Sequence, residues 1–390
     1  MPVTSVPAGK NQKMKVILLT NMPAYQQIDL AEALIAVLGS DNVRLAVYGS
    51  LSKSREKMGW KDQYNQPYLL RFKDSEQDRL QTLQWIADAD VVIQGRFPIK
   101  HVRKRIKQGG LTYAYQERVW KKGFTFLRLL SRIPFLIKNY YSVNRHNYHL
   151  LAAGRYASND LTRLGLFKNR VWKFGYFITA KTMPVKPAIT PLKIIWCGRL
   201  MSLKRPQRAL QLAKILHKAG ASFTLDIVGD GEMRPELELQ ASSLGLSEMV
   251  NFIGWQTVAE VNDRMANAHV FMMTSDHREG WGVVINEAIN NGCFPIVCDE
   301  VGSARWLIQH QRTGLIYRDE DFEQVCNELA TLYVANPNAI LLQGLQGHQR
   351  QTAEWSAQAA ADRLVIHAKA LLAADDAQKL FEAGPCSTAH

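Results

Sequence analysis

Two glutamates separated by seven residues are the first candidates for chemistry in this sequence. Glu279 and Glu287 bracket the loop Gly280-Trp281-Gly282, which follows the apolar run 270–275. Such a run is typical of a buried parallel strand, and we expect a helix to begin near Gly282 and to carry Glu287. Carboxylates accept hydrogen bonds from paired hydroxyl groups such as those of a ribose. The pattern therefore predicts a polyol site at the carboxyl end of a strand.

The two glycines of this loop support a ligand site, because they let the backbone approach a ligand closely. Free N–H groups at the start of the helix would suit a phosphate. The alternative is that Glu279 is a solvated loop residue and that Glu287 only lies on a helix surface, where glutamates are common.

A pair of cations follows an earlier strand-like run, residues 192–197. Gly198 and Arg199 come directly after this run, and Lys204 lies five residues beyond Arg199. Arginine binds phosphate in a bidentate manner and lysine adds a point charge, so the pair is suited to clamp a diphosphate. The alternative is that both cations only make the surface soluble.

These residues carry a resemblance to a known family. The spacing of Glu279 and Glu287, with glycines between them, is similar to the signature of family 4 of the retaining glycosyltransferases. That family has the GT-B fold, in which two Rossmann-like, doubly wound α/β domains face a cleft. The resemblance covers most of the chain, is strongest over residues 192–317 and is weaker before them.

The resemblance implies roles for the residues of the second half. Arg199 and Lys204 would bind the diphosphate of a nucleotide sugar, Glu287 the ribose, and Glu279 the donor hexose. Further donor contacts would come from loop residues, namely Gly198, Gly229, Gly254, Trp255, Gly280, Trp281 and Gly282. The family needs no metal ion, so we expect no metal site and no cofactor besides the nucleotide diphosphate sugar, with a UDP sugar preferred.

The acceptor side departs from the family pattern. Many members have a histidine after a strand of the first domain, whereas Gln94-Gly95-Arg96 and Tyr113 to Glu117 stand at the corresponding places. Glu117 would orient the acceptor hydroxyl, or it is only ion-paired within its cationic surroundings. Arg96 is a similar candidate for anionic groups of the acceptor.

Strand-like and helix-like runs alternate along the chain, which predicts two doubly wound domains. A linker with three prolines, residues 178–191, separates them. The expected divisions are a flexible N-terminus at 1–13, an acceptor-binding domain at 14–181, a nucleotide-sugar domain at 182–350, a helix crossing back at 351–373 and a tail, expected to be frayed, at 374–390.

The positive charge is concentrated in one segment. The chain carries a net charge of +13, and residues 96–145 contain 13 Lys and Arg against the single acid Glu117. Aromatic and aliphatic residues are mixed with these cations, so we expect the segment to face anionic lipid headgroups. The alternatives are an amphipathic helix with a solvated basic face, or nucleic-acid binding, for which no recognisable module is present.

The N-terminus does not resemble a signal peptide, and no stretch is long and apolar enough for a membrane span. The five cysteines lack metal-ligand spacing and indicate reduced core thiols in a cytosolic protein. We therefore expect a cytoplasmic enzyme, peripheral on the inner face of the plasma membrane.

The sequence predicts a retaining hexosyltransferase that acts on a membrane-associated, lipid-linked saccharide in cell-surface polysaccharide or lipopolysaccharide assembly. Two alternatives stay open. One is a soluble GT-B enzyme with a small acceptor, and the other is an inactive subunit that only binds nucleotide sugar.

Overall fold

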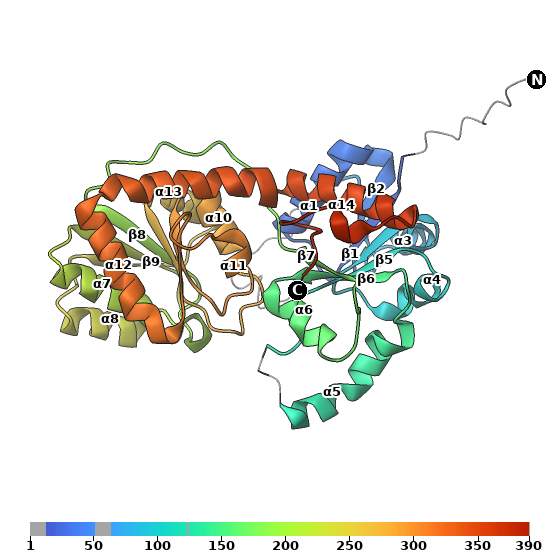
Figure 1. The fold of residues 1–390 in the computed structure, drawn as a ribbon, viewed down its shortest axis with the longest axis horizontal. Coiled ribbons are helices and arrows are strands. Elements are labelled where there is room, and N and C mark those ends of the chain that lie inside the picture. The colour runs from blue at the N-terminus through green and yellow to red at the C-terminus, as the bar shows by residue number, and fades with distance from the viewer. Residues whose placement is uncertain (1–12, 51–63, 122, 124, 390) are drawn as a thin grey trace, which may run out of the picture.

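The computed structural model describes residues 13–50, 64–121, 123 and 125–389, so the predicted flexible N-terminus lies almost wholly outside it. Within these residues the chain forms two parallel sheets side by side, with helices on both faces of each (Figure 1). This confirms the predicted pair of doubly wound domains. The central strands, such as β1 (Val16–Thr20), β4 (Val91–Gln94), β11 (Val270–Met273) and β12 (Phe294–Cys298), are short apolar runs in which every residue is buried, as expected of parallel sheets.

The first domain contains a sheet of seven strands in the order β3-β2-β1-β4-β5-β6-β7. Their bounds are β1 Val16–Thr20, β2 Val43–Val47, β3 Leu69–Arg71, β4 Val91–Gln94, β5 Thr112–Gln116, β6 Tyr148–Ala153 and β7 Val171–Phe174. The sequence did not predict β3, because three residues are too few to show a periodic pattern. The helices are α1 Tyr25–Leu38, α3 Glu76–Asp88, α4 Arg103–Lys107, α5 Phe126–Asn139 and α6 Arg155–Thr162.

The second domain contains a sheet of six strands in the order β10-β9-β8-β11-β12-β13. Their bounds are β8 Leu192–Cys197, β9 Phe223–Val228, β10 Val250–Gly254, β11 Val270–Met273, β12 Phe294–Cys298 and β13 Leu315–Tyr317. The helices are α7 Gln207–Lys218, α8 Arg234–Ser243, α9 Val258–Asn267, α10 Val284–Asn290, α11 Ala304–Leu307, α12 Phe322–Ala335 and α13 Pro337–Arg350. The strand order reverses beside β8, where such sheets bind ligands.

Two segments connect the domains. One runs from the end of β7 to the start of β8, residues 175–191, and the predicted boundary falls inside it. The other is a π-helical turn, Gln351–Trp355, which leads from α13 to α14 (Ala357–Leu372). Ser356 caps α14, because its hydroxyl accepts a hydrogen bond from the Ala359 N–H. α14 then packs on α1, so the last helix lies on the first domain (Figure 1).

The C-terminal residues pack against the first sheet, so the frayed tail expected for 374–390 is wrong. The backbone N–H of Cys386 donates to Lys173 O at 2.8 Å, and that of Ala389 donates to Val171 O at 3.0 Å. Cys386 is fully buried. β7 is the edge strand of its sheet, and its open edge supplies these backbone partners. Backbone pairing of this kind needs no periodic side-chain pattern, so no local pattern could have predicted it.

A buried polar cluster holds α14 on the same sheet. The Tyr113 hydroxyl lies 2.7 Å from His367 Nδ1, and Trp172 Nε1 donates to His149 Nδ1 at 3.1 Å. The rings of Trp172 and His367 meet edge to face, with 4.3 Å between their centroids. Burial lowers the pKa of His149 to about 3 and that of His367 to about 4. Both rings are therefore neutral at neutral pH.

The fold should consequently lose stability in mild acid. Each of these histidines has a folded-state pKa below its ordinary value. Its contribution to the stability of the folded state is therefore present above about pH 6.5 and is lost as the pH falls. Between pH 7 and pH 5 the free energy of unfolding should fall by roughly 2 kcal/mol per histidine. Thermal unfolding followed by circular dichroism at several pH values measures this.

The variant His367→Gln separates this effect from general acid sensitivity. Its Tm at pH 7 should be lower than that of wild type, because Tyr113 loses its partner. Its free energy of unfolding should, however, fall less than that of wild type between pH 7 and pH 5. His217→Gln, at an exposed position in α7, is the matched control and should behave as wild type. An acid-induced loss in His367→Gln as large as that of wild type would contradict the interpretation.

Candidate active site

The two charged groups predicted from separate segments meet at the carboxyl end of the second sheet. Lys204 Nζ donates to Glu279 Oε2 at 2.5 Å, and each side chain is about one-fifth exposed (21% and 20%). Glu279 lies in the loop between β11 and α10, and Lys204 lies in the turn after β8. The Thr274 hydroxyl, at the end of β11, donates to the Lys204 carbonyl at 2.6 Å and fixes this turn. Arg199, two residues beyond β8, is exposed beside it.

Glu287 lies on α10 and faces the first domain. Its side chain is 8% exposed, and its Oε1 accepts a hydrogen bond of 2.6 Å from the hydroxyl of Tyr25, the first residue of α1. Burial raises the pKa of Glu287, although the Tyr25 hydroxyl and the Lys181 ammonium act in the opposite direction. The residue predicted to bind a ribose therefore points between the two domains.

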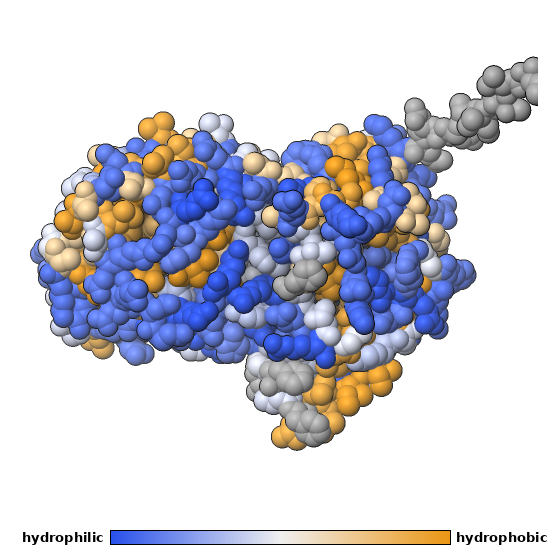
Figure 2. Space-filling view, viewed as in Figure 1, coloured by the Kyte–Doolittle hydropathy of each residue, from blue (hydrophilic) through white to orange (hydrophobic). Residues whose placement is uncertain are grey.

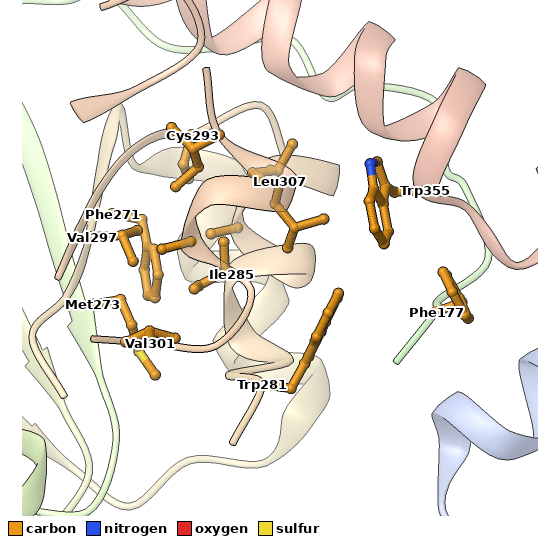
Figure 3. Packing of buried hydrophobic residues seen from close by; sticks show 14 of the residues in the cluster. Phe177, Phe271, Met273, Trp281, Ile285, Cys293, Val297, Val301, Leu307 and Trp355 are labelled. Atoms are coloured by element: carbon orange, nitrogen blue, oxygen red, sulfur yellow. The ribbon is translucent and has the colours of Figure 1, made fainter. Parts of the chain in front are cut away.

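Trp281, which we expected to contact the donor, is buried in the core instead. Its side chain is fully inaccessible, and its Nε1 donates to Asn286 Oδ1 at 2.8 Å. The indole lies beside that of Trp355, with 5.9 Å between their centroids (Figure 3). The ring of Trp306 is also close, with its centroid 6.1 Å from that of Trp281. A Cβ atom on Gly175 would collide with this ring. The indole therefore anchors the loop, and its neighbours Gly280 and Gly282 are buried as well.

Glu117 lies directly across the domain boundary from this loop. A Cβ atom on Gly280 would be 2.6 Å from Glu117 Oε2, so the carboxylate rests against the glycine. Tyr176 donates to Glu117 Oε1 at 2.7 Å, and Lys121 donates to Oε2 at 2.5 Å. Burial raises the pKa of Glu117, but these two partners and the nearby Arg96 outweigh it and leave the pKa lowered. Glu117 is thus ion-paired, and it also lies beside the loop that contains Gly280.

The three glycines predicted near the nucleotide come together where β8, β9 and β10 end. The Gly229 N–H donates to Gly254 O at 2.8 Å, and a Cβ atom on Gly229 would collide with the Gly198 carbonyl. Gly229 also has a φ of 128°, which disfavours other residues. Trp255, next to Gly254, is 49% exposed, which is unusual for so large an apolar side chain.

Gly154, Gly280 and Gly302 make a close backbone contact between the domains. Gly154, at the end of β6, and Gly302, after β12, both meet the carbonyl of Gly280 so closely that neither has room for a Cβ atom. The N–H of Arg155 donates to Gly302 O at 2.9 Å across the boundary. The first domain therefore touches the loop that carries Glu279 and Gly280.

Sequence reasoning missed Tyr25, which donates to Glu287 of the opposite domain, and Tyr176, which donates to Glu117 of its own domain. Both follow the carboxyl end of a strand, and that position is the only signal that could have singled them out. Their contacts join residues 262 and 59 positions apart, which no local pattern records. Among the described residues, no three His, Cys, Asp or Glu side chains are grouped to hold a metal ion.

Comparison with known proteins finds a family model that matches part of the chain. Residues 181–338 match the family model described as glycosyl transferases group 1. Among curated relatives, a GDP-mannose-dependent alpha-(1-6)-phosphatidylinositol monomannoside mannosyltransferase of Mycobacterium tuberculosis is 27% identical over 168 residues, 42% of this chain and 43% of the relative. The amylovoran biosynthesis glycosyltransferase AmsK of Erwinia amylovora is 25% identical over 203 residues, 50% of each chain. The matches thus span about half the length of these relatives or less.

Solved structures resemble the whole chain. The Anabaena protein Alr3699/HepE in complex with UDP matches with a TM-score of 0.60 and 14% identity, covering 93% of this chain and 99% of that one. Sucrose-phosphate synthase from Thermosynechococcus elongatus matches with a TM-score of 0.64 and 15% identity, covering 93% and 100%. At these identities the likeness shows the fold alone, which is GT-B.

The two tryptophans of the site should respond in opposite ways to truncation. Trp281→Ala removes a fully buried side chain and should destabilise the protein by about 3–5 kcal/mol. Trp255→Ala, a matched change at a half-exposed position, should leave the Tm within a degree or two. Calorimetry on both variants measures the difference. Equal Tm values for the two variants would show that the indole of Trp281 does not anchor the loop.

Proposed function

We propose, from the premise that residues 181–338 belong to the glycosyl transferases group 1 family, that this chain is a retaining glycosyltransferase. It would move a hexose from a nucleotide diphosphate sugar, with UDP preferred, to a lipid-linked saccharide at the membrane surface. The observation that carries the proposal is the contact of Glu279 with Lys204 at the sheet edge, eight residues before the buried Glu287.

The donor would bind along the carboxyl edge of the second sheet. Glu287 is proposed to accept from the ribose hydroxyls, while Arg199 and Lys204 hold the diphosphate. One oxygen of Glu279 holds the Lys204 ammonium, and the other can accept from a hexose hydroxyl. The exposed indole of Trp255 is suited to stack on the base. Support for a uridine donor is that the HepE protein was solved with UDP and with UDP-glucose, whereas the mycobacterial relative is named for GDP-mannose.

The proposed chemistry is substitution on one face of the sugar. The bond between the anomeric carbon and the β-phosphate oxygen breaks, and the acceptor oxygen forms its bond on the same face, so the configuration is retained. The acceptor proton passes to an oxygen of the leaving diphosphate. The charge that develops on this diphosphate would be stabilised by Arg199, by Lys204 and by backbone N–H groups of the loop 280–282.

Glu117 is proposed to orient the acceptor. Its lowered pKa keeps it ionised at neutral pH, so it can accept a hydrogen bond from the acceptor hydroxyl but cannot act as an acid. Its contact with Gly280 places it beside the donor loop, and the exposed Arg96 next to it would attract an anionic group of the acceptor.

Within the predicted segment 96–145, we propose α5 alone as the part that would face a membrane. Arg105 is buried, and its guanidinium donates to backbone carbonyls of Ile86, Ala87, Asp90 and Leu111, so it is structural. α5, in contrast, projects from the first domain and exposes Leu127 (78%), Leu130 and Ile137 (Figures 1 and 2).

Aliphatic residues beside cations on a projecting helix suit the surface of an anionic bilayer. None of the helices in the described ranges is long and apolar enough to cross a membrane. We therefore propose peripheral binding, on the cytoplasmic face, for assembly of lipopolysaccharide or another surface polysaccharide. Curated relatives named for amylovoran, colanic acid and lipopolysaccharide core biosynthesis support this acceptor class.

Two other functions are consistent with parts of the structure. A soluble transferase with a small acceptor is favoured by the fold likeness to sucrose-phosphate synthase. An inactive nucleotide-sugar-binding subunit is favoured by the missing first-domain histidine.

Assays of nucleotide release and sugar transfer across UDP, GDP and ADP sugars, with and without anionic vesicles carrying lipid-linked acceptors, distinguish these functions. Binding without turnover on every acceptor would favour the inactive subunit.

The variant Glu279→Ala tests the proposed site. Transfer should fall by about 100-fold or more, because the group that faces the donor hexose and fixes Lys204 is lost. Nucleotide affinity should change little, since Glu287 and Arg199 remain. Glu248→Ala, at an exposed position of the second domain, is the control. Turnover by Glu279→Ala equal to that of wild type would overturn the assignment.

The variant Leu127→Asp tests the membrane surface. Removing a leucine from the bilayer and adding a negative charge should lower binding to anionic vesicles by about tenfold. Leu239→Asp, a leucine equally exposed (73%) on the second domain, is the matched control and should bind as wild type. Flotation with vesicles of phosphatidylglycerol and phosphatidylcholine measures this. Equal loss in both variants would contradict docking through α5.

A further inference from the structure

The proposed ribose site is already occupied by a side chain of the other domain. Tyr25 begins α1, and its hydroxyl donates to Glu287 Oε1 at 2.6 Å. Glu287 is 8% exposed and Tyr25 is half-buried, so their hydrogen bond lies in a partly enclosed position between the domains. In this arrangement Tyr25 is the hydrogen-bond donor that the structure supplies to Glu287.

Neighbouring contacts hold α1 in this position. One turn after Tyr25, the Asp29 carboxylate accepts from the backbone N–H of Thr179 at 2.7 Å, in the connection between the domains. The carbonyl of Thr179 accepts from Asn290 Nδ2 at 3.0 Å, and Asn290 lies on α10 three residues after Glu287. α1 and α10 are thus fastened to each other both directly and through the connection.

A phenol and a ribose hydroxyl are equivalent partners for a carboxylate, because each donates one O–H. Burial and the adjacent Glu287 raise the pKa of Tyr25 well above its ordinary value, so its hydroxyl stays protonated and remains a donor. A ribose that is to bind Glu287 must enter the space enclosed by α1 and α10. The two donors therefore compete for the same group.

We infer that Tyr25 is a gate on the nucleotide site, whose hydroxyl takes the place of a ribose hydroxyl on Glu287 until the donor exchanges with it. This rests on the proposed function, because it takes Glu287 as the ribose ligand. The gate closes the empty site by linking the two domains, and each donor molecule must break the Tyr25 bond before it binds. Affinity for nucleotide is consequently lower than the site alone would give.

The variant Tyr25→Phe tests the gate, because it keeps the ring and removes only the hydroxyl. Tyr68→Phe is the matched control: Tyr68 donates to Glu32 Oε1 at 3.0 Å, so the same kind of bond to α1 is lost within one domain. The Kd values of wild type and both variants are measured by calorimetry with UDP, GDP and the 2′,3′-dideoxy analogues of both nucleotides.

With a gate, Tyr25→Phe should bind the ribonucleotide roughly three- to tenfold tighter than wild type, because the competing bond is gone. The affinity of Tyr25→Phe for the dideoxy analogue should increase much less, since this analogue has no ribose hydroxyl to donate to Glu287. Tyr68→Phe should bind both ligands as wild type does.

Other results would overturn the gate. Unchanged or weaker ribonucleotide binding by Tyr25→Phe would show that Tyr25 is a bystander or itself a ligand of the donor. Equal tightening for the dideoxy analogue would show that exchange at Glu287 is not the cause. Failure of wild type to bind any of these nucleotides would be a different result, because it would reject the proposed function itself and with it the inference.

Discussion

The position of the site depends on the packing of the buried Trp281 indole. Its indole lies between the two segments that connect the domains, since it packs on Trp355 of the π-helical turn and against Gly175 at the start of the other connection (Figure 3). Gly280 and Gly282, on either side of the indole, leave the backbone of the loop with little conformational restraint of its own. The aromatic anchor therefore gives Glu279 and Gly280 a fixed position relative to both domains.

Hydrogen bonds and ion pairs hold the three carboxylates of the site in place. Each of the three site carboxylates has a partner that satisfies it in the absence of any ligand: Lys204 for Glu279, Lys121 and Tyr176 for Glu117, and Tyr25 for Glu287. A buried carboxylate without a partner would be costly. Two of these carboxylates differ in pKa: the partners of Glu117 leave its pKa lowered, so it remains ionised, whereas burial raises the pKa of Glu287.

The strong positive charge of residues 96–145 serves two separate purposes in three dimensions. Arg105 and Arg118 are turned inward, where Arg118 donates to the His277 carbonyl of the second domain at 2.8 Å. α5 instead buries Leu136 but exposes Leu127, Leu130, Ile133 and Ile137 to solvent. A single run of cations in the sequence is thus divided between holding the fold together and forming an outer surface.

Local patterns in the sequence determined the two doubly wound domains, the strands that are long apolar runs, and the segments that carry Glu279, Glu287 and Lys204. They did so because strand and helix periodicity and the spacing of charged residues are properties of neighbouring residues. The contacts of Tyr25 with Glu287 and of Glu117 with Gly280, the burial of Trp281, and the pairing of Cys386 with β7 were decided only by tertiary structure. These contacts join residues far apart in the chain, and their geometry depends on how two whole domains pack, which no short stretch encodes.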